Sequence, residues 1–161
     1  IIALIFTALI RTLIGLVPAI ILTAPLFGVS ILNLGLPLLL LFLSLYIFGI
    51  TLGLFVSAGL IRFGPSFENI AWSSLFLLAP LGCIYYPLEI LPIFFQMIAK
   101  GLPLVYIFDE TRNILLNGEI NYENLKQAYF LNIIYLICGI SLFYYSFLRA
   151  RIKGTLINMG E

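Results

Sequence analysis

An unbroken run of the sequence, residues 12 to 61, contains no Asp, Glu, Lys, Arg or His, and a second such run covers residues 127 to 148. A charged side chain at the centre of a bilayer costs about 2.5–3.5 kcal/mol on insertion scales, so membrane proteins keep ionisable groups in loops and at helix ends. An ordinary globular domain has about 25% charged residues. This chain has 9%, with a mean hydropathy of +1.18. The charge distribution predicts an all-α, polytopic membrane protein.

Apolar runs separated by helix-breaking residues predict about four transmembrane helices. About 20 mostly apolar residues are needed to cross the hydrocarbon core. The first charge-free run is too long for one crossing, and it is interrupted by prolines and glycines between residues 25 and 37. The predicted spans are residues 8–27, 36–61, 67–86 and 125–148.

The stretch between the third and fourth spans, about residues 88–116, is predicted to enter the membrane without crossing it. The stretch is apolar, but Pro92, Lys100, Gly101 and Pro103 interrupt it. Irregular backbone at membrane depth is tolerated only where it is buried in protein or lines a cavity. We therefore expect a re-entrant pair of half-helices before the last span.

The basic cluster RARIK at residues 149–153 predicts the orientation, because cytoplasmic flanks collect Lys and Arg. With four crossings and a cytoplasmic C-terminus, Arg11 and Arg62 lie on the cytoplasmic side, and the acidic stretch 109–123 lies outside. If residues 87–108 formed a fifth crossing, Arg62 and the RARIK cluster would lie on opposite sides. The four-span arrangement is simpler, and we expect a multi-pass protein of the plasma membrane.

The first residues, IIALIFTALI, are apolar but lack the basic flank and the small-residue cleavage site of a signal peptide. The sequence begins at Ile1 rather than at Met. We expect that the chain is truncated at its N-terminus.

Several function classes are disfavoured by composition. A net charge of +1 without a clustered basic face argues against nucleic acid as a partner. The chain has no His, and Cys83 and Cys138 both lie in apolar runs, which argues against a metal site and against an activated nucleophile. The phosphate-loop pattern GxxxxGK[ST] does not occur. We expect no enzyme activity and no cofactor in this chain.

Small residues recur at four-residue spacing in the second predicted span, at Gly49, Gly53 and Ser57. This spacing places them on one helix face and permits close approach of another helix. Packing inside one subunit is the favoured interpretation, and a subunit interface is the alternative.

Ionisable residues of the outer segments have structural and functional interpretations. Glu89 stands between two prolines at the outer end of the third span, where a solvated or helix-capping carboxylate is favoured over a functional one. Asp109, Glu110 and Arg112 form a candidate local ion network, although Glu110 and Arg112 are too close in sequence to face each other on a helix. A structural clamp is favoured over a contact with substrate.

Residues 62–118 resemble the permease domain of type-2 ATP-binding-cassette (ABC) transporters, a family that includes exporters of polysaccharides, lipo-oligosaccharides and drugs. A polar loop leads into a helix with an aromatic residue near its start, a proline-flanked signature follows, and a re-entrant pair closes on a proline and an acidic residue before an arginine. The matching residues are Ala71, Trp72, Pro80, Leu81, Tyr86, Pro87, Leu91, Pro92, Pro103, Asp109 or Glu110, and Arg112. Family members usually have six spans, of which this chain resembles the last four.

The resemblance implies a division of labour between subunits. A partner ABC ATP-binding subunit would hold ATP and Mg, and a second permease subunit, in a homodimer, would complete the path through the lipid membrane. The resemblance places Arg11, Arg62 and Glu68 on the side that docks on the ATPase. It implies an outer gate formed by Tyr85, Tyr86, Pro87, Glu89, Pro92, Pro103, Asp109, Glu110 and Arg112.

Two other functions compete with an exporter of amphipathic, lipid-linked, polysaccharide or drug-like cargo. A secondary transporter or channel predicts an ionisable residue in mid-span or an inverted repeat. The charge-free runs contain no such residue. A membrane enzyme acting on lipid-linked substrates predicts clustered acidic or His residues near a membrane face, and only the 109–123 stretch is acidic.

Overall fold

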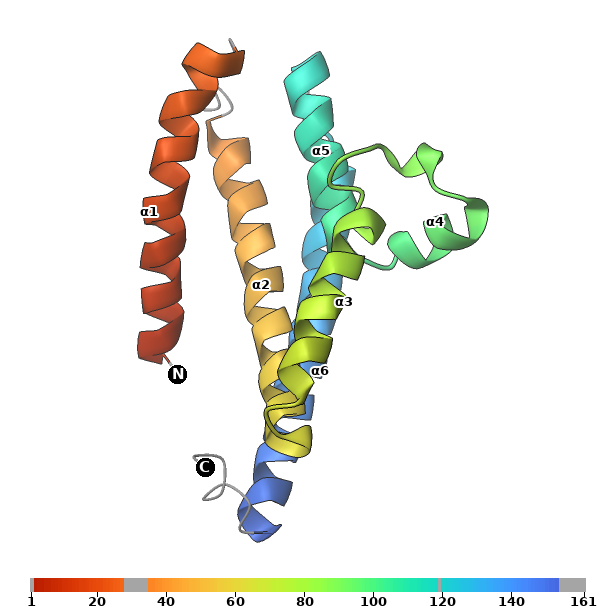
Figure 1. The fold of residues 1–161 in the computed structure, drawn as a ribbon. Coiled ribbons are helices and arrows are strands. Elements are labelled where there is room, and N and C mark those ends of the chain that lie inside the picture. The colour runs from red at the N-terminus through yellow and green to blue at the C-terminus, as the bar shows by residue number, and fades with distance from the viewer. Residues whose placement is uncertain (1, 28–34, 119, 154–161) are drawn as a thin grey trace. The chain divides into compact units, whose positions relative to one another are not determined.

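The computed structural model describes residues 2–27, 35–118 and 120–153, and within these ranges the regular structure is helical, with no strand (Figure 1). The chain divides into two compact units, residues 1–42 and 43–161. Each unit is described by itself. The predicted all-α fold class is confirmed for the described residues.

Helix α1 (Ile2–Phe27) belongs to the first unit and begins about six residues before the predicted span. Pro18 and Pro25 lie inside the helix. The hydroxyl group of Thr12 donates a hydrogen bond of 2.8 Å to the carbonyl oxygen of Ala8 in the preceding turn. Arg11 therefore lies within a continuous helix rather than at its end.

Two helices of the described residues are long and apolar enough to cross a membrane. They are α2 (Leu36–Phe63), with 28 residues, and α6 (Tyr122–Lys153), with 32 residues. At 1.5 Å per residue these helices are about 42 and 48 Å long, more than the roughly 30 Å of a hydrocarbon core. Helix α2 extends two residues beyond the C-terminal end of the predicted span 36–61. Helix α6 extends beyond the predicted span 125–148 at both ends.

Helices α2 and α6 run parallel to each other. Asn132 donates hydrogen bonds to Ser44, and a Cβ atom at Gly139 would lie 3.5 Å from Thr51. From the first contact to the second, the residue number rises from 44 to 51 on α2 and from 132 to 139 on α6, so the two helices have the same direction.

Helix α3 (Phe67–Leu81) follows α2 after a tight turn in which Gly64 has a φ of +76°. The Gly64 amide donates to the carbonyl oxygen of Leu60 at 2.8 Å. Gly59 permits the close approach of the Phe67 ring to α2, because a Cβ atom at this position would overlap the ring.

Helix α3 ends five residues earlier than the predicted span, which runs to Tyr86. Cys83 has a φ of +53°, the left-handed conformation that ends a helix. Its amide donates to the carbonyl oxygen of Pro80 at 3.1 Å. With 15 residues, α3 is about 22 Å long, so the helix alone is shorter than a hydrocarbon core.

The chain between α3 and α6 forms a short 3-10 helix, η2 (Leu88–Ile90), and two α-helices, α4 (Ile93–Ala99) and α5 (Pro103–Asn117). Helix α5 lies along α6 in the opposite direction (Figure 1). A Cβ atom at Gly82 would lie 2.9 Å from Leu104, so the end of α3 is also close to α5. The lower end of α5 is joined to α4 by the connection Lys100–Leu102.

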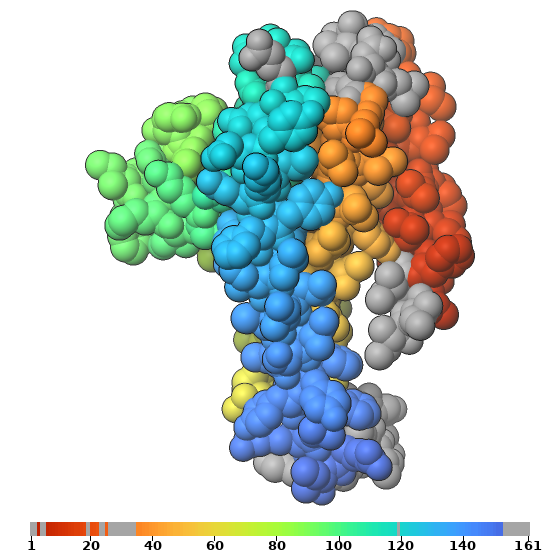
Figure 2. Space-filling view, turned by 180° about the vertical axis from the view of Figure 1, so that it is seen from behind, coloured from red at the N-terminus to blue at the C-terminus, as the bar shows by residue number. Residues whose placement is uncertain are grey.

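Much of the surface of the second unit is apolar. Figure 2 shows α6 from behind, with a large part of its side uncovered by the other helices of that unit. Soluble proteins rarely expose apolar surface of this extent, whereas helices in lipid do. The exposed side chains of α4 and α6 include Ile93, Phe94, Met97, Phe130, Ile133, Ile137 and Ile140.

Candidate functional site

The candidate site is the irregular segment between α3 and α5 together with the helix ends that hold it. Most of its backbone is not in long helices, so its carbonyl oxygens need other partners. Side chains supply several of them. Three of these hydrogen bonds come from tyrosine hydroxyl groups: Tyr86 donates to Pro80 O at 2.9 Å, Tyr106 to Lys100 O at 3.0 Å, and Tyr135 to Gly101 O at 3.0 Å. The other two come from Gln96 Nε2, which donates to Leu91 O at 2.7 Å, and from Arg112 Nη1, which donates to Cys83 O at 2.8 Å.

The turn after α3 is packed as well as hydrogen-bonded. Cys83, Ala99 and Val105 form a buried apolar cluster, so residues of the turn, α4 and α5 meet in one place. Partly buried apolar side chains surround them. These are Tyr86, Leu88, Leu91 and Leu102.

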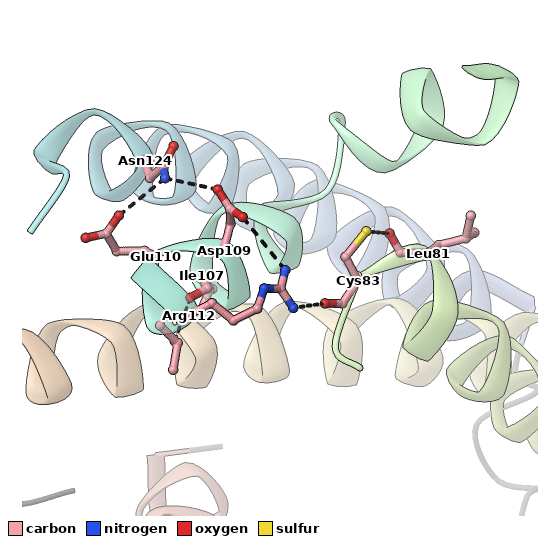
Figure 3. Close-up of polar contacts among 8 residues, drawn as sticks. Leu81, Cys83, Ile107, Asp109, Glu110, Arg112 and Asn124 are labelled. Atoms are coloured by element: carbon pink, nitrogen blue, oxygen red, sulfur yellow. Dashed lines mark hydrogen bonds and ion pairs between the residues drawn. The ribbon is translucent and has the colours of Figure 1, made fainter. Parts of the chain in front are cut away.

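Arg112 links α5 to this turn, as Figure 3 shows. Its Nη1 atom donates to the carbonyl oxygen of Cys83, and its Nη2 atom lies 3.8 Å from Asp109 Oδ1. Asp109 is half exposed and precedes Arg112 by three residues on the same helix. An ion pair of this length and exposure contributes little to stability, so the Cys83 contact is the more important of the two.

Glu110 is buried and binds the start of α6 rather than Arg112. Its Oε1 atom accepts a hydrogen bond of 2.7 Å from the amide of Asn121. Its Oε2 atom accepts one of 3.3 Å from Asn124 Nδ2 (Figure 3). The Asn121 side chain accepts in turn from the amide of Glu123 at 3.0 Å, as an N-cap residue does. A carboxylate at this position is stabilised by the helix dipole.

The predicted ion network is therefore divided. Asp109 faces Arg112 and also lies 3.4 Å from Asn124 Nδ2, whereas Glu110 extends toward the α6 N-terminus (Figure 3). The structure supports a clamp, in which α5 holds the α3 turn through Arg112 and the start of α6 through Glu110.

The other predicted gate residues flank the short helices. Pro87 and Pro92 directly precede η2 and α4, and Pro103 is buried as the first residue of α5. Glu89 is exposed in η2. Tyr85 is also exposed, whereas Tyr86 is half-buried.

Two of the three residues predicted to dock an ATPase lie near the α2–α3 turn. The guanidinium of Arg62 lies 5.4 Å from the centre of the Phe63 ring. Glu68 accepts a hydrogen bond of 3.5 Å from Trp72 Nε1. Both residues are exposed. Arg11 is exposed on α1, in the first unit.

No packing contact within the described residues is seen at the two glycines of the predicted face Gly49, Gly53 and Ser57. Gly49 and Gly53 are exposed, and a Cβ atom at either position would meet no atom within 4 Å. The α2 residues that contact α6 include Ser44 and Thr51, both of them buried. Packing at this face, and its use as a subunit interface, therefore stay predictions.

The polar side chains that bind backbone were not predicted from the sequence. Asn132 and Tyr135 lie in the charge-free run of α6, and Gln96 and Tyr106 lie in the irregular stretch. A hydrogen-bonding side chain among apolar residues is the signal that could have identified Asn132, because buried polar groups need partners. Among the described residues, no group of His, Cys, Asp or Glu side chains could hold a metal ion.

No family model matches the chain, and no curated protein or solved structure matches it.

Proposed function

We propose that the chain is the membrane-spanning subunit of an ATP-driven ABC exporter, with four spans and a re-entrant segment. The helical fold, two helices able to cross a membrane and an extensive apolar surface support the membrane location. The exporter assignment rests on the resemblance of residues 62–118 to the type-2 permease domain.

The parallel arrangement of α2 and α6 is the observation that carries the four-span proposal. Between these helices lie α3 and the irregular segment. If α3 crosses and the irregular segment returns to the side it came from, α2 and α6 run in the same direction. A crossing by the irregular segment would make them antiparallel. The contacts of Asn132 with Ser44 and of Gly139 with Thr51 favour the first arrangement.

The position of the α4–α5 connection supports a re-entrant segment. If the hydrocarbon core ends near Arg149, a thickness of about 30 Å reaches back about 20 residues along α6, to the neighbourhood of Ala128. Tyr135 then lies about 10 Å inside the outer boundary. Its hydroxyl group binds Gly101, so the connection lies at a similar depth. The exposed side chain of Lys100 is long enough to extend toward the interface.

The hydrogen bonds of the irregular segment also support this location. Unpaired backbone groups are costly without water. Side chains of Tyr86, Gln96, Tyr106, Arg112 and Tyr135 pair with carbonyl oxygens that a soluble loop could leave to solvent.

In the proposed exporter, ATP and Mg bind to a separate ATPase on the cytoplasmic side. Two copies of the permease subunit form the path for an amphipathic, lipid-linked, polysaccharide or drug-like substrate. The clamp residues Glu110 and Arg112 stabilise the outer segment, and Arg62 and Glu68 lie on the docking side. The C-terminus is cytoplasmic, and the membrane is the plasma membrane.

Purification of the tagged full chain from its native membrane in mild detergent tests the proposal. The expected partner is a protein that carries GxxxxGK[ST] and hydrolyses Mg-ATP in the complex. Arg62→Glu should lower both its recovery and the complex-bound ATPase activity. Lys126→Glu, an exposed charge reversal at the opposite end of the spans, is the matched control. Recovery of no such ATPase would contradict the proposal, and equal recovery in both variants would contradict docking at Arg62.

A further inference from the structure

One turn of α6 holds two different elements of the second unit. Asn132 Nδ2 donates to the carbonyl oxygen and to the hydroxyl group of Ser44 on α2, at 2.9 and 2.8 Å. One turn further along, Tyr135 Oη donates to the carbonyl oxygen of Gly101 at 3.0 Å. The ring of Tyr135 also meets that of Phe48 on α2 edge to face, with the ring centroids 6.2 Å apart. Helix α6 therefore binds α2 and the α4–α5 connection at one level.

Further along the two helices, a Cβ atom at Gly139 of α6 would lie 3.5 Å from Thr51 and from Leu54 of α2. On α2, Ser44, Thr51 and Ala58 recur every seven residues and are buried, and Thr51 lies against Gly139. A repeat of seven residues is the period of parallel helices that pack side by side. Small residues permit close approach, but a repeating series of them does not by itself select one axial register.

Asn132 is the residue that distinguishes one register from the others. It is fully buried, and its Oδ1 atom has no hydrogen-bond partner among the described residues. If α2 shifted by one turn, the amide would lose Ser44 and face the apolar region around Phe48. An unpaired buried amide is costly, and a single buried Asn fixes the register of parallel helices for this reason.

We propose that Asn132 and Tyr135 form a joint through which the axial position of α2 determines how firmly the α4–α5 connection is held. Asn132 fixes α2 relative to α6. Phe48 of α2 packs on the same tyrosine ring whose hydroxyl group binds Gly101. A displacement of α2 therefore disturbs the ring and weakens the hydrogen bond to the connection.

The joint depends on the proposed function in one respect, namely the partner that would move α2. The cytoplasmic end of α2 carries Arg62, about 27 Å along the helix from Ser44. Movement imposed there by an ATPase would reach the connection between α4 and α5 through α2 and the joint. The hydrogen bonds of Asn132 and Tyr135 exist without a partner, so the joint can be tested without ATP.

The test measures water access to the connection in the full chain in its native membrane. Lys100→Cys, at an exposed position, is the reporter in a Cys138→Ser background, and Cys83 stays because it is buried. The readout is the rate of labelling by a membrane-impermeant maleimide in intact cells. Tyr135→Phe and Ser44→Ala each lose one hydrogen bond and should each raise the rate about threefold, the effect expected for such a loss between helices in a membrane. Asn132→Leu loses both hydrogen bonds to Ser44 and should raise the rate further.

The decisive variant is Ser44→Ala, because Ser44 lies on α2 and acts on the connection only through α6. Its matched control is Ser141→Ala, whose hydroxyl group bonds only within α6, to Ile137. Tyr144→Phe, at an exposed tyrosine of α6, is the control for Tyr135→Phe. If Ser44→Ala labels at the rate of Ser141→Ala, the connection is held independently of α2, and the joint is refuted.

A register measurement covers the case in which Asn132→Leu fails to accumulate. Thr51→Cys and Gly139→Cys place two thiols in contact across the helices, and their oxidative cross-linking reports the register. Ser44→Ala should lower the cross-linking rate about threefold. A change in labelling and cross-linking supports the joint even if no ATPase co-purifies, in which case the exporter proposal alone fails. An ATPase complex with no effect of Ser44→Ala refutes the joint alone.

Discussion

Arg112 Nη1 donates a hydrogen bond of 2.8 Å to the main-chain carbonyl oxygen of Cys83, 29 residues earlier in the chain. This contact joins α5 to the turn that ends α3. Cys83 is buried in a left-handed conformation, so its carbonyl oxygen depends on a partner from the protein.

Replacement of Arg112 by Met should therefore destabilise the outer segment. Met keeps much of the length of the side chain but cannot donate, and a buried acceptor that loses its partner costs about 1–3 kcal/mol. The thermal unfolding midpoint of the full chain in detergent should fall. Arg151→Met, at an exposed position beyond the spans, is the control and should leave the midpoint unchanged. Equal midpoints for the two variants would show that the turn does not need Arg112.

Glu110 should protect the first turn of α6. Glu110→Gln keeps an acceptor for the Asn121 amide but loses the charge that interacts with the helix dipole, and Glu110→Leu loses both. Hydrogen exchange of the amides at 121–126 should accelerate in the order wild type, Gln, Leu, with a total loss of about 1–2 kcal/mol. Glu123→Gln, at an exposed position, is the matched control. Equal exchange in Glu110→Leu and in wild type would contradict the capping role.

Two glycines of α2 should respond in opposite ways to the same substitution. A Cβ atom at Gly59 would overlap the Phe67 ring, whereas one at Gly53 would meet open space. Gly59→Ala should cost about 1–3 kcal/mol because the ring must move. Gly53→Ala should be neutral or slightly stabilising, because Ala favours helix over Gly. Unfolding of the full chain in denaturant measures both, and equal stability of the two variants would contradict the close α2–α3 approach.

Gly49 and Gly53 are exposed, so a subunit interface is the other interpretation of this face. If the second permease subunit packs there, Gly53→Leu should lower the dimer fraction in detergent, as measured by sedimentation, while the unfolding of the monomer stays the same. The reason is that close helix approach needs small residues at the crossing point. A dimer fraction equal to that of wild type would exclude this face as the interface.

Charge-free runs were sufficient to predict the long helices, because exclusion of charge from lipid acts on composition alone. The second predicted span, 36–61, is close to the observed α2. The prediction was poorer at α6, which continues from Tyr122 to Lys153. Lipid excludes charges from the hydrocarbon region, but a helix can extend beyond that region into water. The number of crossings stays a prediction.

The contacts of the site depended on geometry that the sequence pattern does not contain. Tyr135 and Gly101 are 34 residues apart, and only the antiparallel pairing of α5 and α6 brings them together. The four-residue spacing of Gly49 and Gly53 indicated a plausible packing face. The observed contacts with α6 involve Ser44 and Thr51, whose seven-residue spacing is the period with which parallel helices meet.

Labelling from the two sides of the membrane tests the central proposal most directly. Single cysteines replace exposed residues in three places in a Cys138→Ser background: Ser66 in the α2–α3 turn, Asn117 at the end of α5, and Ile152 at the end of α6. A membrane-impermeant maleimide should label Asn117→Cys in intact cells. It should label Ser66→Cys and Ile152→Cys only after permeabilisation. Labelling of Ser66→Cys and Ile152→Cys from opposite sides would contradict the four-span arrangement with its re-entrant segment.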